Sequence, residues 1–371
     1  MKVLFISNDK AIFDAGSSVR TRMKSYADAI GTLHIVGRAR HRVEETDGSL
    51  LLHGYPLPAF LALCMFEGIV RRLVRKEQIE VVSVQDPFEY GWIGMRAVTG
   101  TGAKLHVQLH TDVYSPWFLH GSFATACINR IRLFLAETVL PRADRIRVVS
   151  RRIEATLRNR FGDRLPPVSL LPIPPSVVVP PRKELPKHPF SFVFMAVSRL
   201  EEEKRIPDLF HALFKVQRRY PHAGLIVVGD GRLRTKLMQQ AHVCCKPGSI
   251  MFLPWQDDVL ALLQSAHAFV QASAYEGYGR TFVEAALAHV PIVSTDVGIM
   301  GEVFEHQKEA LLCAPGDIAT LARNMETIIE DERMRVMLPM AAKQKVESHL
   351  ALYADQPRLI AEDLAQAIKK A

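Results

Sequence analysis

Two glutamates, Glu276 and Glu284, stand eight residues apart in the segment EGYGRTFVE, with glycines beside the first of them. A helix that begins near Gly279 would present unpaired backbone N–H groups and its positive dipole end to an anion such as a diphosphate. Gly277 and Gly279 would let the backbone approach that anion closely. Because a carboxylate can accept two hydroxyl groups, the spacing predicts one glutamate facing a sugar and the other a ribose. The alternative is an amphipathic helix with one solvated and one capping glutamate.

A second candidate lies in SRLEEEKRIPDLFHAL, where Arg199 and Lys204 follow the predicted strand Phe192–Val197. Cations at the carboxyl end of a parallel strand lie where ligands of such sheets bind, and they can neutralise a diphosphate. The alternative is surface charge offset by the glutamates at 201–203. The later segment VVGDGRLRTKL places Arg234 where a dinucleotide-binding motif has its third glycine, so a nicotinamide site is disfavoured.

In the first half of the chain, QLHTDVYSP follows the predicted strand Leu105–Leu109. It places His110 and Asp112 on a loop at the carboxyl edge of a sheet, where a histidine can contact a ligand. A lone histidine is also often structural, and Asp112 either serves an acceptor or caps the next turn. Gly16 and Ser17 precede a predicted helix and form another loop of this kind.

The five cysteines are scattered, without a Cys-x-x-Cys pair or a matching histidine spacing. This distribution predicts reduced, buried thiols rather than a disulfide framework or a zinc site. Two adjacent aspartates, Asp257 and Asp258, are expected to begin a helix. The sequence therefore predicts no metal site and no bound cofactor.

The elements that position these residues alternate between short β-branched runs and amphipathic stretches, which is typical of parallel α/β sheets. Strands are predicted in the first half at Val3–Ser7, Leu33–Val36, Val81–Gln85, Leu105–Leu109 and Ile146–Val149. A second series is predicted at Phe192–Val197, Leu225–Val228, Ile250–Leu253, Ala268–Gln271 and Ile292–Ser294. Helices are predicted between the strands, for example Val19–Ile30 and Ile128–Leu140, and almost throughout the tail from Gly316.

Seven prolines between Pro172 and Pro189 separate the two series. Because proline fixes φ and cannot donate to a strand ladder, this stretch is expected to be an extended linker. The predicted organisation is an N-terminal Rossmann-like domain at 1–171, the linker at 172–189 and a C-terminal Rossmann-like domain at 190–350. A final helix at 351–371 could cross back to the first domain. Two doubly wound domains facing a central cleft would place ligands on the loops that follow the strands.

The motifs resemble those of a known family. EGYGRTFVE resembles the Glu-x7-Glu motif of the group 1 glycosyl transferases, which are family 4 retaining enzymes of the GT-B fold. SRLEEEKRIPDLFHAL is similar to the family's loop in which an arginine and a lysine hold the donor diphosphate, and the likeness extends over most of the chain. The resemblance implies that the C-terminal domain binds a nucleotide sugar and the N-terminal domain binds the acceptor.

Residue by residue, the resemblance implies catalytic roles for Glu276, His110, Arg199 and Lys204. It implies donor contacts at Glu284, Gly277, Tyr278, Gly279, Arg280, Thr281, Gly16, Ser17, Leu253 and Trp255. Asp112 is the candidate on the acceptor side. The family's first loop usually has a Gly-Gly pair, which is Gly-Ser in this sequence and leaves a direct phosphate contact open.

The activity implied is transfer of a sugar, hexosyl or related, to an acceptor hydroxyl with retention of configuration. The acceptor would be a glycan or a lipid-linked molecule in polysaccharide or glycolipid synthesis. Metal-dependent transferases of the other major fold use an Asp-x-Asp triplet, which is absent here, so metal independence is expected. Alternatives are a sugar phosphorylase or nucleotide-sugar epimerase of the same fold, or a non-catalytic subunit that binds a nucleotide sugar or anionic lipid.

The net charge of +8 arises entirely from residues 1–170, where 24 Lys+Arg face 16 Asp+Glu. This asymmetry predicts an anionic partner such as a membrane surface or a phosphorylated acceptor, and no nucleic-acid-binding pattern accompanies it. Two segments, Pro58–Gln78 and Trp117–Arg147, combine apolar residues with cations and could form interfacial helices. The alternative is that their apolar residues belong to the domain core and their cations to a solvated face.

No apolar run approaches the roughly 20 residues that span a bilayer. The N-terminal MKVLFISND has a short apolar stretch without a cleavage site and is better interpreted as a buried strand than as a signal peptide. The expected location is the cytoplasm, with a peripheral position on the inner face of the plasma membrane as an option.

Overall fold

The computed structural model describes residues 1–56, 62–173, 175 and 178–369. The chain divides into two compact units. The first comprises Met1–Tyr114, Ser122–Ile173 and Tyr353–Ala371, and the second comprises Ser115–Gly121 and Pro174–Leu352. The C-terminal segment therefore groups with the first unit, and Ser115–Gly121 groups with the second although it precedes the linker. No helix in the described ranges is long and apolar enough to cross a bilayer.

In the described part of the chain, the first unit has an eight-stranded sheet of order β3-β4-β2-β1-β5-β6-β7-β8. Its strands are β1 (Lys2–Ser7), β2 (Thr32–Arg38), β3 (Val43–Asp47), β4 (Leu50–Tyr55), β5 (Val81–Val84), β6 (Lys104–Leu109), β7 (Arg145–Val148) and β8 (Val168–Leu170). All neighbouring strands are parallel except β3, which is antiparallel to β4. The five predicted strands are confirmed, with ends shifted by one or two residues. The edge strand β3 was not predicted because its sequence, VEETD, is polar and solvent-facing.

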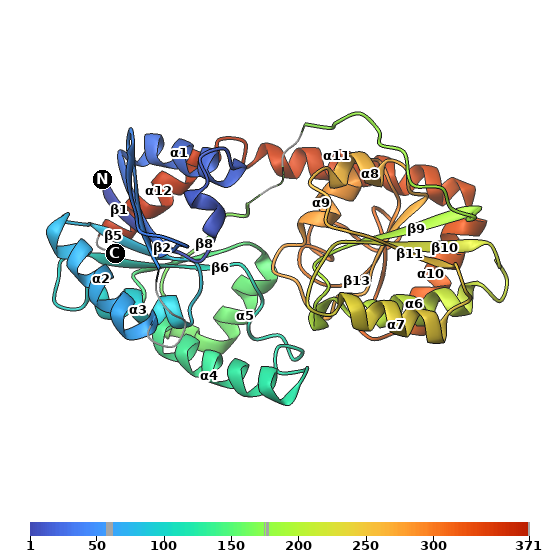
Figure 1. Cartoon of the computed structure of the whole chain (residues 1–371), viewed down its shortest axis with the longest axis horizontal. Coiled ribbons are helices and arrows are strands. Elements are labelled where there is room, and N and C mark those ends of the chain that lie inside the picture. The colour runs from blue at the N-terminus through green and yellow to red at the C-terminus, as the bar shows by residue number, and fades with distance from the viewer. Residues whose placement is uncertain (57–61, 174, 176–177, 370–371) are drawn as a thin grey trace. The chain divides into compact units, whose positions relative to one another are not determined.

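Helices cover both faces of this sheet. On one face lie α1 (Ser18–Ile30) and α12 (Gln356–Ile368), side by side in Figure 1. On the other lie α2 (Ala62–Lys76), α3 (Glu89–Val98) and α4 (Phe123–Val139), and α5 (Arg151–Phe161) follows β7. The C-terminal helix α12 is fixed to the sheet by a buried contact of 3.0 Å between His106 Nε2 and Asp363 Oδ2. Burial alone would raise the pKa of the Asp363 carboxyl, but its contacts with His106 and the Arg145 guanidinium hold that pKa well below its usual range.

The second unit has a wholly parallel sheet, whose six described strands have the order β11-β10-β9-β12-β13-β14. They are β9 (Phe192–Val197), β10 (Ala223–Val228), β11 (Ile250–Leu253), β12 (Ala268–Gln271), β13 (Ile292–Thr295) and β14 (Leu311–Cys313). One face carries α6 (Ile206–Val216), α7 (Arg234–Cys244) and α10 (Ile318–Glu330). The other carries α8 (Val259–Leu263), α9 (Arg280–Leu287) and α11 (Glu332–Ala351) (Figure 1). The predicted strands are confirmed, whereas the three-residue β14 was missed.

Both sheets reverse their strand order at one point. In the second unit β10 lies on one side of β9 and β12 on the other, and in the first unit β1 lies between β2 and β5. Ligands of open α/β sheets bind outside the carboxyl ends of the strands at such a switch point. The loops after β9 and β12 are therefore where the second unit should carry its site.

Candidate active site

Three side chains converge on one carboxylate oxygen at the switch point of the second unit. Lys204 Nζ lies 2.6 Å from Glu276 Oε1, Gln271 Nε2 lies 2.7 Å from it and Ser273 Oγ lies 2.9 Å from it. The side chains of Lys204 and Glu276 are each only 12% exposed, so water screens this ion pair little. Two residues that were predicted from separate motifs, after β9 and after β12, are thus in direct contact.

Gln271 and Ser273 were not predicted as site residues. Gln271 ends β12 and uses both ends of its amide: Nε2 donates to Glu276, and Oε1 accepts from Thr281 Oγ1 at 3.0 Å. The backbone of Ser273 is fixed in turn by Thr295 Oγ1, which donates to its carbonyl at 2.7 Å. One feature of the sequence could have identified Gln271: it is a polar residue at the end of the apolar strand AFVQ. A buried amide needs hydrogen-bond partners, so such a residue indicates a polar network.

The glycine at 279 is required by the local backbone. Gly279 has φ +86° at the position before α9, and a Cβ there would lie 2.4 Å from the ring of Phe282. The N-cap residue of α9 is Gly279, so no N-cap side chain accepts from the first N–H groups of the helix. Its first N–H groups, at Arg280 and Thr281, are therefore available to a bound anion, which the helix dipole also favours. A diphosphate is the anion that the sequence predicts at this position.

Glu284 lies one turn inside α9 in a different environment from Glu276. Its side chain is 18% exposed, and its nearest cation in the described structure is Arg280, at 4.0 Å. Burial raises the pKa of Glu284, and Arg280 offsets this only in part. A buried carboxylate without close donors is costly unless a ligand supplies them, and the hydroxyls of a ribose would do so.

Arg199 and Tyr278 are less engaged with this network. The Arg199 side chain is 69% exposed and lies 3.6 Å from Glu203 Oε1, so it can turn toward a ligand at little cost. Tyr278 is buried, and its hydroxyl lies 3.1 Å from His349 Nε2 on α11. Its ring thus packs within the unit, while Gly277 beside it is also buried.

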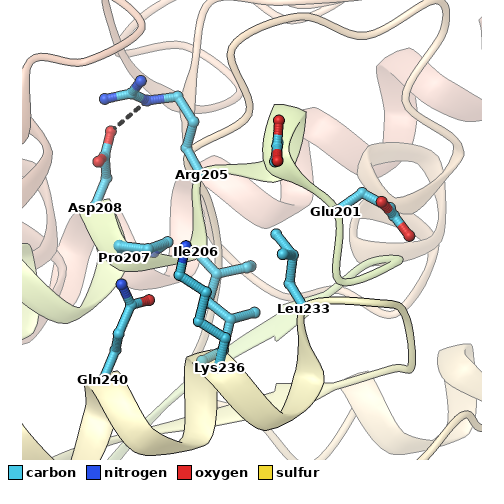
Figure 2. Close-up of a pocket in the computed structure, with 10 residues that line it drawn as sticks. Glu201, Arg205, Ile206, Pro207, Asp208, Leu233, Lys236 and Gln240 are labelled. Carbon is cyan, nitrogen blue, oxygen red and sulfur yellow. Dashed lines mark hydrogen bonds and ion pairs between the residues drawn. The ribbon is translucent and has the colours of Figure 1, made fainter. Parts of the chain in front are cut away.

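The loop that carries Arg199 and Lys204 is held in shape by its neighbours. Arg205 adopts a left-handed backbone with φ +47°, pairs with Asp208 at 2.6 Å and stacks over the Trp117 ring at 4.7 Å. Behind this loop lies a pocket of about 210 Å³ between the starts of α6 and α7 (Figure 2). Its lining includes none of the predicted catalytic residues; it comprises Glu201, Glu202, Arg205, Ile206, Pro207, Asp208, Leu233, Lys236, Leu237 and Gln240.

Two of the donor contacts that the resemblance implies, Leu253 and Trp255, lie at the end of β11 and just after it. The Leu253 carbonyl accepts from the backbone N–H of Gly229 at 3.1 Å and from Arg234 Nη1 at 3.2 Å. Arg234, which replaces the third glycine of a dinucleotide motif, therefore ties the loop after β10 to β11. Trp255 is 59% exposed, and its indole N–H donates to Asp257 at 3.1 Å. The nearby Asp258 precedes α8, as predicted.

On the first unit, His110 follows β6 and is partly enclosed there. Burial, together with the nearby Arg147, Arg22 and His106, lowers the pKa of His110 to about 3, so the imidazole is neutral at pH 7. Arg147 itself is 1% exposed and donates to the Leu171 carbonyl at 2.7 Å. The first unit therefore holds a neutral histidine beside buried positive charge.

Four further residues at this edge have defined roles or environments. Ser17 Oγ caps α1 by accepting from the N–H of Arg20 at 3.1 Å, which explains a serine where the family has a second glycine, and Gly16 is exposed beside it. Asp112 is buried after β6. Asp86 follows β5 at the switch point, and burial raises its pKa to about 6. Sequence reasoning missed Asp86.

The described residues contain no group of three or more histidine, cysteine or carboxylate side chains arranged to hold a metal ion. Among the cysteines, Cys127, Cys244, Cys245 and Cys313 are free thiols. The side chain of Cys64 lies outside the described residues.

Two family models match the chain. Residues 181–345 match the family described as glycosyl transferases group 1, and residues 26–176 match the glycosyl transferase 4-like domain. Glycogen synthase of Mycobacterium tuberculosis is 33% identical over 154 residues, which are 41% of this chain and 37% of that enzyme. The chain thus matches well under half the length of this curated relative.

Solved structures match almost the whole chain. Sucrose-phosphate synthase of Thermosynechococcus elongatus is 19% identical, with a TM-score of 0.79 over 98% of this chain and 99% of that one. Anabaena HepE, solved in complex with UDP-glucose, is 19% identical, with a TM-score of 0.74 over 98% of this chain and 100% of that one. These likenesses confirm the predicted GT-B fold. Because both family models match and each unit contains the expected α/β sheet, the chain belongs to the group 1 glycosyl transferases.

Proposed function

We propose that the chain transfers a hexosyl or related sugar from a nucleoside-diphosphate sugar to an acceptor hydroxyl, with retention of configuration and without a metal ion. The acceptor is a glycan or lipid-linked molecule of cell-envelope polysaccharide or glycolipid synthesis. The observation that carries the proposal is the half-buried contact of Lys204 with Glu276 beside the start of α9, where Gly279 supplies no capping side chain. UDP-glucose bound by HepE, a protein of the same fold, supports a donor of this class.

The network suggests how a donor binds. Without a ligand, Lys204 and Glu276 neutralise each other at 2.6 Å. A nucleotide sugar offers a partner to each of them, because its diphosphate is an anion and its sugar carries hydroxyl groups. Lys204 then holds the diphosphate together with Arg199 and the N–H groups of α9, and Glu276 accepts from the sugar. Glu284 accepts from the ribose.

The same groups assist the chemical step. Bond cleavage leaves negative charge on the diphosphate, and Lys204, Arg199 and the helix N–H groups stabilise that growing charge. In the proposed front-face transfer, the acceptor hydroxyl attacks from the side of the leaving group. Its proton passes to the departing phosphate, so no dedicated base takes part. His110, neutral at pH 7, can hydrogen-bond a donor-sugar hydroxyl, and Asp112 is proposed on the acceptor side.

The test is donor turnover without a known acceptor. The protein is incubated with uridine, guanosine and adenosine diphosphate sugars, and release of the nucleoside diphosphate is followed together with the anomer of the freed sugar by NMR. We expect slow hydrolysis of one donor with retention, and no turnover by Glu276→Gln. Sugar 1-phosphate formed from a glycan and inorganic phosphate, without a nucleotide sugar, would indicate a phosphorylase. An isomerised nucleotide sugar would indicate an epimerase. Thermal stabilisation without turnover would indicate a non-catalytic binder.

A further inference from the structure

In the first unit, the helices α2 and α4 both combine apolar and basic residues. They differ in whether their large apolar side chains are buried or exposed. In α2 the side chains of Phe66, Val70, Leu73 and Val74 are at most 8% exposed, so they form core. Residues 57–61, which begin one of the candidate interfacial segments, lie outside the described residues. Most of the large apolar side chains in the described part of that segment are therefore turned into the unit, with Met65, 50% exposed, as the exception.

In α4 the arrangement is reversed. Phe123 is 83% exposed, Ile128 50%, Ile131 62% and Phe134 68%. At 100° per residue, these positions fall within an arc of about 140°, while Asn129 and Ala136 on the opposite side of the helix are buried. Four large apolar side chains exposed on one helical face exceed the scattered singles that are normal on a protein surface.

The charges around this face are positive. Arg130 is exposed on α4, and within the described ranges it makes no ion pair. Arg142 is exposed just past the end of the helix. The one acidic residue of α4, Glu137, is paired with Arg160 at 2.7 Å. The face thus offers apolar side chains with cations beside them and no unpaired acid.

A second basic feature lies in the same helical layer, because α2 packs on α3 and α3 packs on α4 (Figure 1). A shallow hollow of about 480 Å³ on α2 is lined by Gly68, Arg71, Arg72, Arg75 and Lys76. Its charged lining residues are all cations, which is a suitable environment for a phosphate group.

We propose that the layer formed by α2, α3 and α4 docks on an anionic phospholipid bilayer. The Phe123, Ile131 and Phe134 side chains enter the acyl boundary, and the α2 hollow receives lipid phosphates. Apolar insertion beside unpaired cations is the combination that binds an anionic bilayer, whereas a protein groove would have to supply matching acids. The inference goes beyond the proposed transfer reaction and does not depend on which donor is used.

The first test is flotation with vesicles of phosphatidylglycerol and phosphatidylcholine, compared with phosphatidylcholine alone. The wild type should float with the anionic vesicles only, and release as salt rises. Phe123→Ser with Phe134→Ser should lower the partition coefficient by about tenfold for each phenylalanine inserted. The matched control is Phe214→Ser, which removes a phenylalanine 52% exposed on α6 of the second unit and should float like the wild type.

The second test separates charge from apolar insertion. Arg72→Glu with Arg75→Glu should abolish flotation at low salt, while Lys215→Glu with Arg218→Glu makes the same charge change on exposed residues of the second unit and should not. Melting temperature and donor hydrolysis, measured on every variant, report folding. Should the double phenylalanine variant fold poorly, Phe123→Ser alone, at the most exposed position, gives the same comparison.

Two results would overturn the proposal. One is equal flotation of the wild type and the double phenylalanine variant. The other is a wild type that ignores anionic vesicles but forms a dimer in size-exclusion chromatography that the phenylalanine variant abolishes, since the occupant of the face would then be a second copy of the chain.

Discussion

At the carboxyl edges of the two sheets, the charged side chains have different kinds of partner. At the edge of the second unit, cations and carboxylates are paired, as in Lys204 with Glu276 at 2.6 Å and Arg205 with Asp208 at 2.6 Å. At the edge of the first unit, the buried Arg147 donates to backbone carbonyls and to the Gln108 amide. Burial lowers its pKa to about 10.

The difference suggests two modes of binding. A ligand of the second unit must replace existing partners, so it needs both an anion and hydroxyl groups, as a nucleotide sugar has. A ligand of the first unit meets a neutral His110 in a positive environment, which disfavours any further cation. Exchange of paired charges at the edge of the second unit suits the anion and the hydroxyl groups of the proposed donor. The neutral imidazole at the edge of the first unit suits the sugar hydroxyl that His110 is proposed to bind.

The largest expected effect comes from Glu276→Gln. Transfer should fall by about a thousandfold or more, because a neutral amide accepts sugar hydroxyls poorly and leaves Lys204 without its counter-charge. The amide keeps the side-chain volume, and the folded state should remain intact by melting temperature. Glu276→Ala should lose as much activity but also some stability, because it leaves a nearly buried ammonium unpaired. Wild-type turnover in folded Glu276→Gln would contradict the site.

The next effect concerns the cations. Lys204→Ala should lower kcat by about a hundredfold. Arg199→Ala should lower it by only about tenfold, because the Arg199 side chain is exposed and water can take over part of its contact with the diphosphate. Single-turnover kinetics with the preferred donor measures both. If both variants raise only KM, their role reduces to uniform binding. In the double variant, the effects of Lys204→Ala and Glu276→Gln on the free energy of activation should not add, because the two side chains are in contact.

Glu284→Gln should weaken nucleotide binding and, at the same time, raise the stability of the fold. We expect binding of the free nucleoside diphosphate to weaken by about tenfold to a hundredfold, through loss of charge-assisted hydrogen bonds. The raised pKa of Glu284 means that the folded state holds its proton more tightly than the unfolded state, so this carboxyl costs stability as pH rises through its folded pKa. The variant should therefore melt higher than the wild type at pH 8. Unchanged nucleotide affinity would disprove the ribose contact.

The smallest effect is the pH response of His110. Because its folded pKa is about 3 and its unfolded pKa about 6.5, the unfolded state binds more protons between these values, and stability falls as pH falls through this window. Denaturation at pH 7 and pH 5 measures how much the free energy of unfolding falls in acid. That fall should be smaller in His110→Gln than in the wild type. Equal losses would show that the histidine is solvated rather than enclosed.

Much of this arrangement could be predicted from the sequence. All ten predicted strands are present, because the apolar run that marks a strand is a local property, whereas β3, β4, β8 and β14 were missed. Arg199, Lys204 and Glu276 lie on the loops after β9 and β12, as predicted. The contact of Lys204 with Glu276 was not predictable, since it joins loops 72 residues apart that only the order of β9 and β12 brings together. Gln271 and Asp86 were missed for the same reason: their partners or burial are set by neighbouring strands.

The central claim is that Glu276 faces the donor sugar while Glu284 faces the nucleotide. Calorimetry of a nucleoside diphosphate and of its sugar derivative, with the wild type and each glutamine variant, tests it most directly. In Glu276→Gln, the affinity added by the sugar should vanish while the nucleoside diphosphate still binds. In Glu284→Gln, the affinity for the nucleoside diphosphate should fall while the increment from the sugar remains. If both variants lose the two contributions in the same proportion, the division of roles between the glutamates is wrong.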